Sequence, residues 1–158
     1  MIKGTNQSTS PIHLLHRANQ GVTEIFTAEI ASDLTVRQMA VLSAIERAVG
    51  VSQTGIVKQT GIDRSTVAEM IGRLQKKGLL QRRRSREDAR AYAIKLSDEG
   101  RRVLKKAEPL AKRVDEKILR AVDDRGSTFL ENLSTLVTRL ESSQKARRPS
   151  SDRANGRR

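Results

Sequence analysis

Residues 53–90 constrain the fold of this 158-residue chain more than any other stretch. Apolar residues recur there at helical spacing in two short segments, and Gly61 separates them. Glycine tolerates a left-handed backbone, so the first helix can end there without a side-chain clash. Two helices joined by so tight a turn can place the second one in the major groove of duplex DNA.

Residues that begin helices frame this stretch. Thr35, Ser52 and Asp63 each precede an apolar-periodic segment, and such residues accept hydrogen bonds from the free N–H groups of a first turn. The segment after Thr35 is expected to end at Gly50 and to face inward with Val36, Met39, Leu42, Ile45 and Val49. Strands are expected at 79–84 and 91–96, which gives a helix-turn-helix at 53–77 and a hairpin wing at 80–96.

Three further amphipathic segments flank this winged helix-turn-helix core. Residues 12–31, 98–122 and 127–141 are expected to be helical, with a kink at Pro109 and an N-cap at Ser127. Their apolar stripes have too little chain around them to be covered within one protomer, which indicates dimerisation helices. The predicted fold class is therefore mainly α with a small β-hairpin wing, and residues 11–141 form one domain.

Composition narrows the partner. The formal net charge of +13 indicates a polyanion, and this alone fits DNA, RNA or an anionic membrane surface. No apolar run is long enough to span a bilayer, which predicts a cytoplasmic location at the nucleoid. Aromatic residues make up only 2% of the chain, too few to stack single strands, so duplex DNA is favoured. Residues 1–10 are expected to form a flexible arm and residues 142–158 a disordered basic tail, which either attracts DNA or only aids solubility.

The N-terminal turns of the second helix in the helix-turn-helix carry the predicted base contacts. Arg64 can pair with guanine O6 and N7, and Ala68 can rest against a thymine methyl group. The hydroxyls of Ser65 and Thr66 can contact base edges or phosphates, and Arg73 lies where a phosphate is the expected target. The alternative is that these residues form only the solvated face of an amphipathic helix.

The hairpin carries the predicted backbone contacts. Basic residues dominate it, and the expected phosphate contacts are Arg82, Arg83, Arg84 and Arg86. Asp88 and Arg90 form an Asp-x-Arg pair in which the carboxylate can hold the guanidinium for insertion into a minor groove. A purely structural turn is the alternative.

These motifs resemble the MarR family of bacterial transcription regulators. The matching signs are Leu34-Thr35, the sequence from Asp63 to Thr66, Gly78-Leu79 and Asp88-x-Arg90. The resemblance implies a homodimeric repressor on a palindromic operator, released by a small aromatic or phenolic acid or its thioester. Some members sense oxidants through cysteine, and this chain has none.

A polar stripe near the N-terminus is the candidate effector site. Arg17 can fork a carboxylate, and His13, His16 and Gln20 can donate to it; a solvated or inter-subunit face is the alternative. Two histidines without a third ligand do not indicate a metal site, and no cofactor is expected. The chain has no phosphate-binding glycine loop and no nucleophile elbow, so an enzyme is not expected. The alternative function is a non-specific architectural DNA-binding protein.

Overall fold

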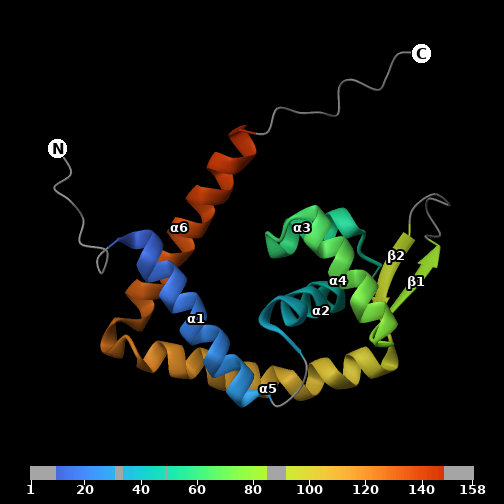
Figure 1. Cartoon of the computed structure of the whole chain (residues 1–158), viewed down its shortest axis with the longest axis horizontal. Helices are drawn as coiled ribbons and strands as arrows, with labels where there is room; N and C mark the ends of the chain where they lie inside the picture. Colours follow the sequence, from blue (N-terminus) through green and yellow to red (C-terminus); the bar gives the residue numbers. More distant parts are fainter. Residues whose placement is uncertain (1–9, 31–33, 49, 85–91, 148–158) are drawn as a thin grey trace. The chain divides into compact units, whose positions relative to one another are not determined.

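The computed structural model describes residues 10–30, 34–48, 50–84 and 92–147, with side chains for all but 83–84, 92 and 144–147 (Figure 1). The chain divides into two compact units, residues 1–117 and 118–158, which are described separately. The first unit contains α1 (Pro11–Glu29), α2 (Val36–Arg47), α3 (Gln53–Thr60), α4 (Arg64–Lys76), β1 (Leu80–Arg84), β2 (Tyr92–Leu96) and most of α5 (Asp98–Arg120). The second contains the end of α5, the 3-10 turn η2 (Asp123–Arg125) and α6 (Gly126–Arg147).

The predicted fold class is confirmed. β1 and β2 form a two-stranded antiparallel sheet whose register runs from Leu80 opposite Leu96 to Arg84 opposite Tyr92. Helices α2, α3 and α4 precede this hairpin, in the order of a winged helix. Each of these helices and strands turns an apolar side inward. The core that they share contains the fully buried Leu42, Ile56, Ile71, Leu74 and Ile94.

Local side-chain chemistry sets the helix starts where the sequence predicts them. Thr35 and Gln38 form a capping box, in which the Gln38 amide donates to the Thr35 hydroxyl at 3.2 Å and the Thr35 amide to the Gln38 side chain at 3.0 Å. Ser52 caps α3 by accepting from the Gly55 amide at 3.2 Å. Gly61 ends α3 with a φ of 66°, in the left-handed region that glycine tolerates.

The inner face of α2 matches the prediction at Leu42 and Ile45 but not at Val36. Val36 is 38% exposed, whereas Gln38 and Val41 are buried. Gln38, a member of the capping box, lies on the buried side of α2, and Val36, two residues earlier, lies on the opposite side of the helix. α2 also ends at Arg47, three residues before Gly50, whose φ of 76° places it in the turn beyond the helix.

The prediction for the C-terminal helix was wrong at both ends. η2 runs directly into α6 at Gly126, so Ser127 lies inside the helix and does not cap it. At the other end α6 continues to Arg147, so residues 142–147 belong to the helix rather than to a disordered tail. The hydroxyls of Ser142 and Ser143 donate to the carbonyls of Thr138 and Arg139, one helical turn earlier, at 2.8 and 2.9 Å.

The other helices flanking the core form close to the expected positions. α1 begins at Pro11, whose fixed φ suits a first helical turn, and ends at Glu29. α5 passes through Pro109 as one helix and buries Leu104, Ala107 and Val114. Lys117 of α5 forms an ion pair with Glu29 of α1. Among the residues that the structure describes, no helix combines the length and the apolar character needed to cross a membrane.

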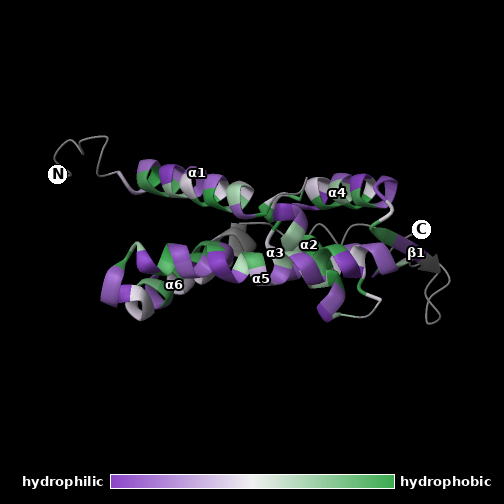
Figure 2. Cartoon of the chain, turned by 90° about the horizontal axis from the view of Figure 1, so that it is seen from below, coloured by the Kyte–Doolittle hydropathy of each residue, from purple (hydrophilic) through white to green (hydrophobic). Residues whose placement is uncertain are grey.

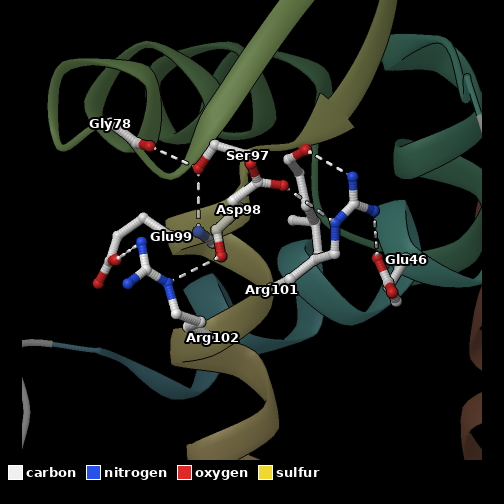
Figure 3. A network of polar contacts seen from close by, with 9 residues as sticks. Glu46, Gly78, Ser97, Asp98, Glu99, Arg101 and Arg102 are labelled. Atoms are coloured by element: carbon white, nitrogen blue, oxygen red, sulfur yellow. Dashed lines mark hydrogen bonds and ion pairs between the residues drawn. The ribbon is translucent and has the colours of Figure 1, made fainter.

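A polar joint connects the hairpin to α5 (Figure 3). The buried Ser97 hydroxyl donates to the Gly78 carbonyl at 2.6 Å and accepts from the Gly100 amide at 2.9 Å. Arg101 reaches Glu46 of α2 at 3.6 Å and the Leu96 carbonyl at 3.5 Å. The turn after α4, the end of β2, the first turn of α5 and the C-terminal part of α2 are therefore held at one place.

Both units expose apolar side chains. On α1, Ile12 is 82% exposed, and Leu14 and Leu15 are nearly half exposed. On α6, five apolar residues between 38% and 51% exposed are Leu130, Leu133, Leu136, Val137 and Leu140. Hydrophobic and hydrophilic residues alternate along both helices in Figure 2. Apolar surface of this extent on a helix is typical of a surface covered by a partner.

Candidate nucleic-acid interface

The N-terminal turn of α4 is held by the side chain of Asp63. Its Oδ1 accepts from the Thr66 amide at 2.9 Å and from the Ser65 hydroxyl at 2.6 Å. The inner side of the helix buries Val67, Met70, Ile71 and Leu74. The opposite side therefore faces solvent at the positions predicted to contact DNA, which include Arg64, Ser65 and Ala68.

The Asp63 carboxylate remains ionised at neutral pH. The hydrogen bond from the Ser65 side chain, followed by those from Thr66, holds the pKa of Asp63 well below its usual range. Its negative charge also lies at the N-terminus of α4, where the helix dipole favours an anion. The turn that carries the predicted base contacts is thus fixed before any ligand arrives.

Gln53 is a residue of this surface that the sequence did not indicate. Its side-chain amide donates to the backbone carbonyl of Arg64 at 3.2 Å and so ties the start of α3 to the start of α4. The two residues are 11 positions apart, and only the geometry of the turn brings them together. No local pattern could have identified this contact.

The side chain of Arg73 is exposed and forms an ion pair on the surface of α4. Its guanidinium pairs with Glu69, one helical turn earlier, at 2.5 Å, and both side chains are more than half exposed. Exposed pairs of this kind contribute about 0–1 kcal/mol, so a phosphate can compete with the carboxylate. Thr66 is half-buried and presents less of its side chain than Ser65 does.

The structure describes only part of the predicted wing contacts. Arg82 lies exposed on β1, opposite Ile94 of β2. The backbones of Arg83 and Arg84 continue the strand. Arg86, Asp88 and Arg90 lie outside the described residues, so the predicted Asp-x-Arg pair stays a prediction.

The candidate effector residues are on α1. His13, His16, Arg17 and Gln20 are all exposed. Within the described part of the chain, no three His, Asp or Glu side chains are grouped closely enough to hold a metal ion. All four predicted effector residues therefore lie on one helix, α1, in contact with solvent.

Comparisons with known proteins agree on one family. Residues 32–91 match the sequence model of the MarR family. The transcriptional regulator HosA of Escherichia coli O127:H6 is 36% identical over 87 residues, which cover 55% of this chain and 64% of HosA, less than two thirds of its length.

Two solved structures are similar over most of both chains. Bordetella bronchiseptica BpsR, whose DNA binding is regulated by 6-hydroxynicotinic acid, has a TM-score of 0.77 and 28% identity, covering 86% of this chain and 98% of BpsR. The transcriptional repressor CouR, bound to a 23-mer DNA duplex, has a TM-score of 0.76 and 31% identity, covering 87% of this chain and 99% of CouR. These relatives are transcriptional regulators and not enzymes.

Proposed function

Because this chain belongs to the MarR family of transcriptional regulators, we propose that it binds a specific operator in duplex DNA through α4 and the hairpin. The observation that carries the proposal is the N-terminal turn of α4. Asp63 and Gln53 fix this turn from two sides, while Arg64 and Ser65 remain exposed beside them. A fixed helix start with an exposed arginine is what base reading in the major groove requires.

The contacts divide into base readers and phosphate clamps. The proposed base readers are Arg64, Ser65, Thr66 and Ala68. The proposed phosphate contacts are Arg73, Arg82, Arg83, Arg84 and Arg86, with Asp88 orienting Arg90 at the wing tip. Phosphate contacts fix orientation without carrying sequence information, so the specificity of this surface is assigned to α4.

We further propose that the protein acts as a homodimer. α6 exposes an apolar stripe, and α1 exposes Ile12, Leu14 and Leu15. A second copy of the chain is the partner that the family relationship favours. Two-fold symmetry then places two α4 helices on half-sites about 34–36 Å apart, which predicts a palindromic operator.

A small aromatic acid or thioester is the proposed effector. The similarity to BpsR, whose DNA binding 6-hydroxynicotinic acid regulates, supports this class of ligand. His13, His16, Arg17 and Gln20 supply cationic and polar groups for a carboxylate. The ligand releases the repressor if it prefers a conformation that fits DNA poorly, and a preference of about 1.4 kcal/mol weakens operator binding tenfold.

The proposed location of the protein is the cytoplasm, where it acts at the nucleoid.

Selection from a random duplex library, followed by footprinting, tests sequence-specific binding. We expect enrichment of a short palindrome and protection of two half-sites. Arg64→Ala should relax the preference at one position per half-site, whereas Arg82→Ala should weaken all duplexes alike and reduce the salt slope by about one. Equal affinity for selected and random duplexes would instead establish the non-specific architectural alternative.

Two further measurements test the dimer and the ligand. Leu136→Glu should lower the sedimentation mass from dimer to monomer, because it places a charge in the apolar stripe of α6. 6-Hydroxynicotinic acid serves as the ligand probe, and we expect it to raise the Tm of the wild type but not of Arg17→Ala. A truncation after residue 147 keeps α6 whole and should leave operator choice unchanged.

A further inference from the structure

The hydroxyl proton of Ser65 is already used within the protein. Ser65 Oγ lies 2.6 Å from Asp63 Oδ1. An ionised carboxylate has no proton to give, so the serine must be the donor of this bond. A serine hydroxyl has one proton and two acceptor lone pairs. Ser65 therefore presents only acceptor capacity to the outside.

Because Ser65 can only accept a hydrogen bond, it can bind only those DNA groups that donate one. Phosphate oxygens, purine N7, guanine O6 and thymine O4 are all acceptors and have no proton to offer. The exocyclic amino groups N6 of adenine and N4 of cytosine are the donors in the major groove. An acceptor on the protein surface matches these two groups and none of the others.

The groups around Ser65 favour the conformation in which its hydroxyl donates to Asp63. Turning its hydroxyl toward an acceptor on DNA would break a charge-assisted bond, and such bonds are stronger than neutral ones. It would also take one donor away from Asp63 Oδ1 close to the negatively charged duplex. Arg64, next in the chain, supplies the donors that guanine requires. The first turn of α4 thus offers a donor and an acceptor side by side.

We propose that Ser65 is a specificity-determining residue that accepts a hydrogen bond from the exocyclic amino group of adenine or cytosine, and that it does not contact phosphate. This rests on the proposed function, in which α4 enters the major groove. The sequence left open whether Ser65 contacts a base edge or a phosphate. The proposal selects the base edge and limits the contact to the exocyclic amino groups.

Base analogues in the selected operator test the proposal. Selections with the wild type and with Ser65→Ala identify the base pair whose preference depends on the serine. At that pair, purine replaces adenine or pyrimidin-2-one replaces cytosine, which removes only the amino group. The matched control is the 7-deaza purine at the same pair, which removes the N7 acceptor and keeps the amino group.

We expect the loss of the amino group to weaken wild-type binding about three- to tenfold more than it weakens binding of Ser65→Ala, the effect of one hydrogen bond. The 7-deaza substitution should weaken both proteins equally. Any effect of the analogue on the duplex itself is common to both proteins and cancels in the comparison.

The opposite outcomes overturn the inference. If the 7-deaza loss depends on Ser65, or if neither analogue loss does, the serine is not an amino-group acceptor. A uniform loss on all duplexes with Ser65→Ala would assign it to phosphate. Failure of the wild type to select any sequence would refute the proposed function itself, a result distinct from each of these. Asp63→Gly, which frees the hydroxyl at little cost to the cap, should let Ser65 also donate, so that selection with this variant also accepts bases that present only an acceptor at this pair.

Discussion

Replacing Gly100 with alanine should destabilise the protein, although Gly100 lies in a helix. A Cβ atom at this position would stand 2.1 Å from the backbone carbonyl oxygen of Leu79, and ordinary contacts of this kind begin at 3.4 Å. The obstacle is backbone, so no side-chain rotation relieves it. Either the first turn of α5 or the turn after α4 must move by more than about 1 Å, which strains the two bonds of Ser97.

The magnitude follows from opposing terms. Alanine favours a helix over glycine by about 1 kcal/mol. Overpacking costs about 1–3 kcal/mol, and weakening of the two Ser97 hydrogen bonds adds about 1 kcal/mol or more. We expect Gly100→Ala to lower the free energy of unfolding by about 1–3 kcal/mol, which is about 2–12 °C in Tm for a chain of this size.

Thermal unfolding followed by circular dichroism at one fixed protein concentration provides the measurement. Gly72→Ala is the matched control, because Gly72 lies in α4 and a methyl group added there would meet nothing within 4 Å, so the same substitution should leave the protein equally or more stable. If Gly100→Ala unfolds at the wild-type temperature, the close approach of α5 to the turn is refuted.

Three other predictions concern single polar groups. Ser97→Ala should cost about 2 kcal/mol, because it leaves two backbone groups without their partner, whereas Ser142→Ala, which removes an exposed bond, should cost less than about 0.5 kcal/mol in the same denaturant titration. The folded pKa of Asp63 lies below its unfolded value, so the contribution of this carboxylate to stability is present above about pH 4 and is lost as the pH falls further. The difference in free energy of unfolding between wild type and Asp63→Asn should therefore shrink when the pH is lowered from about 7 to about 3. A difference that stays constant over this range would argue against the cap. Glu69→Gln should raise affinity for all duplexes and steepen the salt dependence in fluorescence anisotropy titrations, since Arg73 no longer pairs with a carboxylate; unchanged binding would exclude Arg73 from the phosphate contacts.

The sequence predicted the features that depend on a few neighbouring residues. Asp63 caps α4 and Gly61 ends α3 because each needs only its own conformation and the adjacent backbone. The same locality explains the error in α2. Apolar periodicity alone placed Val36 inward, whereas the structure buries the polar Gln38 of the capping box, on the other side of the helix from Val36.

Contacts between residues far apart in the chain could not be predicted from the sequence. The link from Gln53 to Arg64 depends on the angle between two helices, and that from Ser97 to Gly78 depends on how the hairpin folds back. Neither has a spacing that marks it in the sequence. The bond from Ser65 to Asp63 joins residues only two positions apart, yet its consequence for donor and acceptor capacity becomes visible only once the 2.6 Å distance is known.

Ser97 is the only residue between the last residue of β2 and the first of α5. An α-helix turns by about 100° for every residue, so one residue inserted or deleted here would rotate the whole of α5 relative to the hairpin. The side that buries Leu104, Ala107 and Val114 would then point away from its packing partners. The number of residues at this joint is therefore fixed by the direction in which α5 must face, and an insertion or deletion here should destabilise the protein more than Ser97→Ala does.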